Sequence, residues 1–135
     1  MADHLVLDAF ALLAYLQREP GHQRVRSLLD DAALGRVSLS MCAVNFGEVL
    51  YWLERRRGVA AANALTGNVR DLPINLVDAD LDLTVSAARI KAAHPVSLAD
   101  AYAAALAQRL DAAVLTADPD FQRLEGAVAI EWLTG

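Results

Sequence analysis

Apolar residues recur along the chain in two different rhythms. Short runs of consecutive apolar residues are typical of strands that are buried on both faces of a sheet. These runs predict strands at residues 4–8, 37–40, 74–77, 113–116 and 128–132. Elsewhere the apolar residues return every three or four positions, which is the spacing of an amphipathic helix. That spacing predicts helices at residues 9–19, 22–34, 43–57, 59–70, 80–93 and 97–110, and a short helical turn at 121–124.

Short strands that alternate with helices indicate an α/β domain with a central parallel sheet of four to five strands, covered on both faces. Crossovers between parallel strands are right-handed, so the C-terminal ends of all strands lie on one edge of the sheet. Ligands of such sheets bind in the crevice at that edge, where the strand order reverses. Acidic residues that follow strands can therefore be distant in sequence and close in space.

The chain of 135 residues is expected to form a single domain over residues 1–135. Cys42 is the only cysteine, which excludes an intramolecular disulfide and a cysteine-rich zinc site. The N-terminal segment lacks a basic start and never reaches the ~20 apolar residues of a membrane span. We therefore expect a cytoplasmic protein without a membrane partner.

The net charge of −5 argues against a general electrostatic attraction to nucleic acid. Eleven of the twelve basic residues are arginines, and Arg55, Arg56 and Arg57 are consecutive. We favour the interpretation that these three side chains complement the dipole at a solvated helix end. A local phosphate-binding patch is the alternative, because the planar guanidinium matches phosphate oxygens.

Three aspartates lie where helices are predicted to begin. Asp8 ends the first strand and can cap the following helix. Asp100 comes three residues after Ser97, in a variant of the capping box. Asp118 precedes Pro119, which suits an N-cap with proline at the first helical position. Each aspartate thus has a structural explanation of its own.

Glu48 has a weaker structural explanation, since it lies at the margin of the solvent face of the helix predicted at 43–57, one turn after Asn45. If Glu48 and the three aspartates point to one edge of the sheet, a hard divalent cation would offset their mutual repulsion. Such an ion activates water and polarises phosphoryl oxygens. Four acids at one edge therefore indicate metal-assisted hydrolysis of phosphodiester bonds.

Four segments of the chain resemble the PIN-domain ribonucleases, and more narrowly the VapC-type toxins of bacterial toxin–antitoxin pairs. They occur in the order of the family and read LVLDAFALLAYL, SMCAVNFGEVLYWL, PVSLADAYAAALAQRL and VLTADPDF. The resemblance implies a three-layer α/β/α PIN-like domain. It also implies a metal-dependent endoribonuclease, the toxin of a type II toxin–antitoxin system.

The resemblance assigns the catalytic acids by position: Asp8, Glu48, Asp100 and Asp118. Three of them, Asp8, Asp100 and Asp118, would bind Mg²⁺, with Mn²⁺ as a substitute. Residues in contact with the substrate or with these ligands would be Thr116, Asn45 and Asp120. One departure is Phe10, where many relatives carry a serine that supplies a hydroxyl near the site.

The resemblance further implies three partners: a cognate VapB-like antitoxin that inhibits the enzyme, an RNA substrate, and a second copy of the chain in a homodimer. Two alternatives belong to other classes of function. One is a PIN-like module that binds RNA or protein without catalysis. The other is an aspartate-dependent phosphatase, which fits less well because it needs a second aspartate where Phe10 stands.

A second acidic run, VDADLDL, contains Asp78, Asp80 and Asp82 and looks like the start of a calcium loop. An EF-hand loop would need glycine at its sixth position and glutamate at its twelfth. Leu83 and Arg89 occupy those positions. We therefore interpret this run as the acidic start of a helix.

Overall fold

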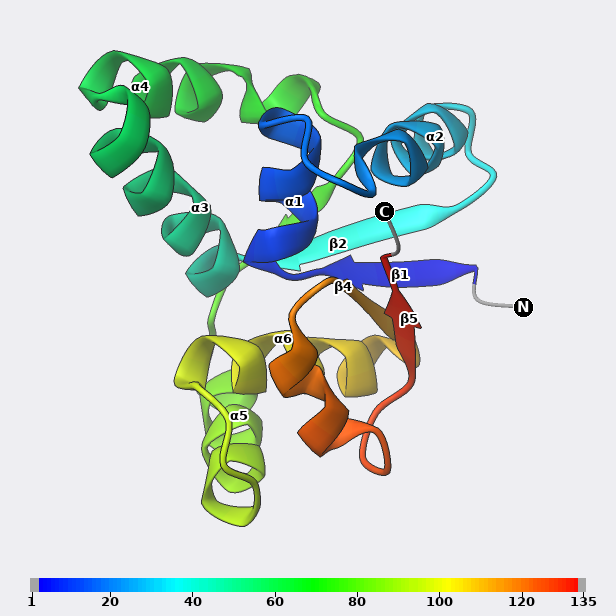
Figure 1. Ribbon diagram of the computed structural model, residues 1–135. Helices are drawn as coiled ribbons and strands as arrows, with labels where there is room; N and C mark the ends of the chain where they lie inside the picture. Colours follow the sequence, from blue (N-terminus) through cyan, green and yellow to red (C-terminus); the bar gives the residue numbers. More distant parts are fainter. Residues whose placement is uncertain (1–2, 134–135) are drawn as a thin grey trace.

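The computed structural model describes residues 3–133, which contain a five-stranded, all-parallel sheet (Figure 1). The strand order is β3-β2-β1-β4-β5. The strands are β1 (His4–Leu7), β2 (Ser38–Cys42), β3 (Asn75–Val77), β4 (Ala113–Thr116) and β5 (Ile130–Trp132). Each predicted strand is present, with ends that differ from the prediction by two residues or fewer.

The helices connect these strands in the predicted order. They are α1 (Ala9–Leu16), α2 (His22–Ala33), α3 (Ala43–Arg57), α4 (Val59–Asn68), α5 (Leu81–Ala93) and α6 (Leu98–Leu110). Two 3-10 segments complete the chain, η1 (Val69–Asp71) and η2 (Pro119–Leu124). No helix in the part of the chain described by the structure is long and apolar enough to cross a membrane.

Helices cover both faces of the sheet, so the predicted three-layer α/β/α arrangement is confirmed (Figure 1). Successive side chains of a strand point to opposite faces. Leu5 and Leu7 of β1 accordingly pack in a core with α1, α2, α3 and α4. Val6 packs in a second core with α5, α6 and η2. The two cores hold β1 at the centre of the domain.

The strand order places β1 beside both β2 and β4. The chain moves from β1 through β2 to β3 on one side, and then returns to the other side of β1 with β4 and β5. The order therefore reverses between β1 and β4, which is the point where open α/β sheets bind ligands. Asp8 follows β1 and Asp118 follows β4, so both lie at this position.

Candidate active site

Asp8 and Thr116 connect the C-terminal ends of the two central strands. Oδ1 of Asp8 accepts a hydrogen bond from the backbone N–H of Ala11 (2.9 Å), so Asp8 caps α1. Oδ2 of Asp8 accepts a hydrogen bond from the Thr116 hydroxyl. The Thr116 hydroxyl oxygen in turn accepts from the N–H of Asp118 (2.9 Å). Asp8 and Thr116 are both buried, so this chain of hydrogen bonds holds the ends of β1 and β4 and the backbone of Asp118 in place.

Three further acids form a cluster close to Asp8. Asp100 lies in the first turn of α6, where the hydroxyl of Ser97 caps the helix by accepting from the Asp100 N–H (3.1 Å). Asp118 caps η2 by accepting from the N–H of Asp120 (3.0 Å). Carboxylate oxygens of Asp100, Asp118 and Asp120 all lie within 4.8 Å of one another. Oxygens at this spacing can share one ion.

This oxygen cluster differs from the predicted set of metal ligands in one member. The family resemblance implies Asp8 as a ligand and an auxiliary role for Asp120. In the structure the cluster contains Asp120, whereas the two oxygens of Asp8 engage Ala11 and Thr116. The sequence contains a signal for Asp120, because an aspartate that caps a turn accepts from the backbone two residues later. That geometry brings Asp118 and Asp120 together.

Glu48 reaches the same site from α3. It is half-buried, and its pKa is raised by burial and by the nearby charge of Asp118. Asn45 lies one turn earlier on α3 and is fully buried. Its Nδ2 donates to the backbone oxygen of Ala99 (3.1 Å), next to Asp100. Asn45 therefore ties α3 to the start of α6 and holds Glu48 relative to Asp100.

The oxygen of the Asn45 side-chain amide, Oδ1, has no hydrogen-bond partner among residues 3–133. A buried polar atom without a partner costs free energy, so such atoms commonly mark a bound water or ion. The Oδ1 atom of Asn45 is thus a buried hydrogen-bond acceptor, one helical turn before Glu48.

Burial and mutual repulsion raise the pKa of two aspartates of the site. Burial is the larger cause for Asp8, whose pKa rises to about 7, and the charges of Asp100 and Asp118 raise it further. The hydrogen bonds from Thr116 and Ala11 oppose this rise. Burial, followed by the charge of Asp118, raises the pKa of Asp100 to about 6. Without a cation the site therefore retains protons that free carboxyl groups would lose.

The site fits a hard divalent cation. Its donors are carboxylate oxygens, which Mg²⁺ and Mn²⁺ prefer. Within the described range, 3–133, no ion pair involves Asp8, Glu48, Asp100 or Asp118. Asp120 makes one long ion pair, with Arg123 at 3.9 Å. The negative charge of the cluster is therefore not balanced by basic side chains of the protein itself.

Asn45→Ala is expected to destabilise the fold, because it removes the hydrogen bond between α3 and α6 and leaves a gap where a fully buried side chain stood. The lost hydrogen bond should cost about 0.5–1.5 kcal/mol, and the gap adds to that cost. Asn63→Ala is the matched control, since Asn63 is an exposed asparagine on α4. Denaturant unfolding of both variants measures the difference. Equal stability of the two variants would contradict the anchoring role of Asn45.

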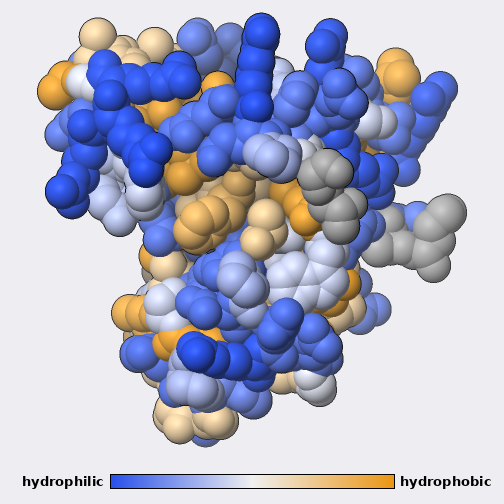
Figure 2. Space-filling model, in the orientation of Figure 1, coloured by the Kyte–Doolittle hydropathy of each residue, from blue (hydrophilic) through white to orange (hydrophobic). Residues whose placement is uncertain are grey.

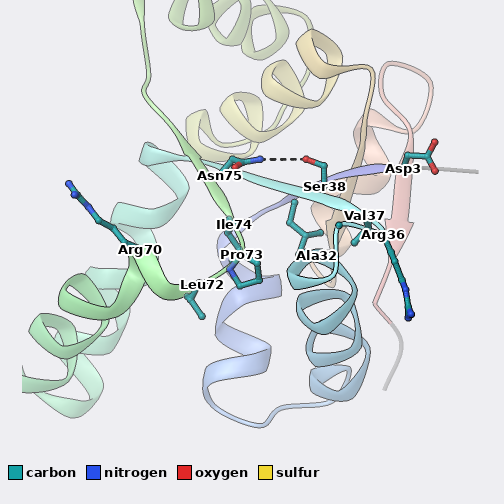
Figure 3. A pocket seen from close by; sticks show the side chains of 12 residues that line it. Asp3, Ala32, Arg36, Val37, Ser38, Arg70, Leu72, Pro73, Ile74 and Asn75 are labelled. Atoms are coloured by element: carbon teal, nitrogen blue, oxygen red, sulfur yellow. Dashed lines mark hydrogen bonds between the residues drawn. The ribbon is translucent and has the colours of Figure 1, made fainter.

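One cavity of the domain lies away from the acids. It has a volume of about 720 Å³ and lies beside the starts of β2 and β3 (Figure 3). Ser38 and Asn75 are joined there by a hydrogen bond (3.4 Å), while Arg36 and Arg70 extend away from each other. The acids follow the opposite ends of the strands, so this cavity is separate from the candidate site.

Comparisons with known proteins agree with this geometry. The family model for the PIN domain matches residues 5–127. Among solved structures, the DNA-bound VapBC from Salmonella typhimurium is similar with a TM-score of 0.75 and 20% identity, over 96% of this chain and 98% of that chain. VapC20 from Mycobacterium tuberculosis, described as a toxin that cleaves the sarcin-ricin loop, has a TM-score of 0.72 and 18% identity, over 93% and 96%.

VapBC2 from Rickettsia felis, bound to a fragment of promoter DNA, has a TM-score of 0.72 and 12% identity, over 96% of this chain and 98% of that chain. A comparison with curated proteins finds no match. The likeness to solved structures at these identities concerns the fold, whereas the family model covers most of the sequence. The predicted relationship is thereby confirmed: the chain belongs to the PIN domain family.

Proposed function

We propose that this protein is a metal-dependent endoribonuclease and the toxin of a type II toxin–antitoxin pair. The observation that carries the proposal is the cluster of carboxylate oxygens from Asp100, Asp118 and Asp120, within 4.8 Å of one another at the reversal point of the sheet. The buried Asp8 and the half-buried Glu48 lie near the cluster and would add negative charge once a cation displaces their protons. The membership of the PIN family supports nuclease chemistry on this arrangement.

The proposed roles of the residues follow from their positions. A bound Mg²⁺ or Mn²⁺ would polarise a phosphoryl oxygen and make water a better nucleophile. The clustered carboxylates of Asp100, Asp118 and Asp120 would hold the ion. Glu48 would accept the proton of the attacking water, because burial and Asp118 raise its pKa above that of an ordinary glutamate.

Asp8 and Thr116 would maintain the geometry of the site. Their shared hydrogen bond links the ends of β1 and β4, and Thr116 also accepts from the N–H of Asp118. The negative charge of Asp8 would add to the attraction for the cation. Thr116 would act as a positioning residue for both aspartates.

No observation favours the two alternatives. An aspartate-dependent phosphatase would need a second acid at the position of Phe10, whose side chain is exposed beside Asp8. A PIN-like binding module without catalysis would have no need for five acids at one edge. The nuclease proposal accounts for these residues together.

The proposed partner is a VapB-like antitoxin. Two of the similar solved structures are VapBC assemblies bound to DNA. Figure 2 shows a hollow on one face of this chain, with apolar residues inside it and hydrophilic residues along its rims. An antitoxin segment that inhibits the enzyme would cover the acids. We expect the toxin to act in the cytoplasm, as a homodimer.

Removal of divalent cations is expected to abolish RNA cleavage. The test incubates purified protein with a labelled single-stranded RNA in Mg²⁺, in Mn²⁺ and in excess EDTA, and resolves the products on a gel. Cleavage should stop in EDTA and return when Mg²⁺ exceeds the chelator. Protein carrying Asp100→Asn and purified in the same way controls for contaminating nucleases. The metal requirement would be contradicted if the unmodified protein cleaved RNA at full rate in EDTA while the Asp100→Asn protein did not.

A further inference from the structure

An aromatic and basic surface continues along α3 from Glu48. Three residues lie on the same side of the helix as Glu48: Trp52, four positions later, and Arg55 and Arg56, seven and eight positions later. With a rise of 1.5 Å per residue, Trp52 lies about 6 Å and Arg55 about 10 Å further along the helix axis. We call Tyr51, Trp52, Arg55 and Arg56 the α3 strip. It begins next to the acids and leads away from them.

The α3 strip lines a cavity of its own. The cavity has a volume of about 340 Å³ and is lined by Tyr51, Trp52, Arg55 and Arg56. The rings of Tyr51 and Trp52 lie 6.2 Å apart at an angle of 47°. The guanidinium carbon of Arg56 lies 4.4 Å from the centre of the Trp52 ring, which is a cation–π contact. The cavity thus combines aromatic faces with basic groups.

The charge of the strip has no acidic partner. Within the described residues, none of the ion pairs involves Arg55 or Arg56. The tyrosine of the strip is 49% exposed, although large apolar and aromatic side chains are usually covered. Arginine forks and aromatic faces together are the groups that bind phosphates and unstacked bases.

An acidic site can bind RNA only if basic groups nearby attract the phosphate backbone. RNA is a polyanion, whereas the protein has a net charge of −5 and gathers five acids at the site. The site itself therefore repels the backbone of the substrate, and attraction has to come from basic groups at its border. The α3 strip is a group of arginines on the same helix as Glu48.

We infer that the α3 strip docks single-stranded RNA next to the acids. One base stacks on Trp52 and Tyr51, and Arg55 and Arg56 contact the phosphates beside it. The inference rests on the proposed function, because the strip would hold the same RNA that the acids cleave. Stacking needs a base that is free of a duplex, so the ligand class is single-stranded RNA.

The test measures the binding of a fluorescein-labelled oligouridine by anisotropy in EDTA, over a range of salt concentrations. Trp52→Leu keeps an apolar side chain and is expected to weaken binding at least fivefold, as the loss of one stacked base would. Tyr51→Ala is a second variant at an exposed position and should weaken binding in the same direction. Melting curves of each variant identify loss of binding that is due to unfolding.

The double variant Arg55→Gln, Arg56→Gln keeps the length of both side chains and removes their charges. It should make the dependence of log K on log salt shallower by about 1.4, or about 0.7 for each lost phosphate contact on a single strand. Arg89→Gln is the matched control, because Arg89 is an exposed arginine on α5 in the opposite layer. It should change neither the affinity nor the salt dependence.

Two outcomes would overturn the inference. One is an unchanged salt dependence in the double variant together with unchanged binding in both aromatic variants. In the other outcome the α3 strip binds protein instead of RNA. The double variant then disrupts an assembly of protein chains, while its affinity for RNA equals that of Arg89→Gln. Binding through the strip without cleavage in any metal would support the inference and reject the proposed function, so the two failures are distinguishable.

Discussion

Asp8→Asn, Asp100→Asn and Asp118→Asn are each expected to lower RNA cleavage by at least ~100-fold, since even groups that only support metal ligands cost 10–100-fold when they are removed. An amide keeps the shape of the carboxyl group but removes the negative charge that attracts a cation. Asp100 and Asp118 contribute oxygens to the cluster, and Asp8 lies buried beside them. Initial rates on one labelled RNA, at saturating Mg²⁺, measure the loss.

Two other aspartates provide matched controls for this prediction. Asp78 and Asp82 are exposed and lie between β3 and the first turn of α5, outside the acidic cluster. Asp78→Asn and Asp82→Asn should therefore retain rates close to that of the unmodified protein. Equal losses in the controls and in the three site variants would show that the site is misassigned.

Asp120→Asn separates the ligand set implied by the family resemblance from the set favoured by the oxygen cluster. Asp120 is exposed and contacts Arg123, yet its carboxylate lies with those of Asp100 and Asp118. We expect a loss of about tenfold, between the controls and the buried acids. A rate equal to that of Asp78→Asn would remove Asp120 from the site.

The fold could be predicted because local signals agree with the global arrangement. Helix α3 has the predicted bounds, and Gly58, with φ of +92°, stops it in a conformation that favours glycine. Ser97 caps α6 by accepting a backbone hydrogen bond, as the capping-box pattern indicates. Asp80 lies at the start of α5, as the acidic run predicts, and the structure shows that it caps this helix. The apolar runs of β1 and β4 are buried on both faces, as parallel strands require.

Other features depend on contacts that no local pattern encodes. The helix predicted over residues 9–19 ends at Leu16, because Arg18 adopts a left-handed conformation (φ +53°) that few non-glycine residues favour. Asn45 binds the carbonyl of Ala99, 54 positions later, and that distance hides the pair from sequence patterns. The pairing of Asp8 with Thr116 likewise requires β1 to lie beside β4.

The second large effect concerns stability, and it follows from the buried carboxyl group of Asp8. Its pKa is raised from the usual 3.8 to about 7, chiefly by burial. Between these values the unfolded chain has released the proton while the native state still holds it. The free energy of unfolding therefore falls as the pH rises from about 4 to 7, by about 1.4 kcal/mol for each unit of pH that separates the two pKa values. The raised pKa of Asp100, about 6, adds to the fall in the lower part of this window.

Asp8→Asn should remove the contribution of Asp8 to this fall while it preserves the local structure. The asparagine oxygen can still cap α1, and its amide can donate to the Thr116 oxygen. In EDTA at pH 8, we expect the variant to melt several degrees above the unmodified protein, at roughly 3–5 °C for each kcal/mol in a domain of this size. The difference should shrink as the pH falls towards 3.8, below which Asp8 is protonated in both the native and the unfolded protein. Millimolar Mg²⁺ should stabilise the unmodified protein more than the variant, because an ion that binds only the native state adds stability according to its affinity. A variant that is less stable at pH 8 in EDTA, with equal shifts in Mg²⁺, would make Asp8 a helix cap alone and remove its charge from the metal site.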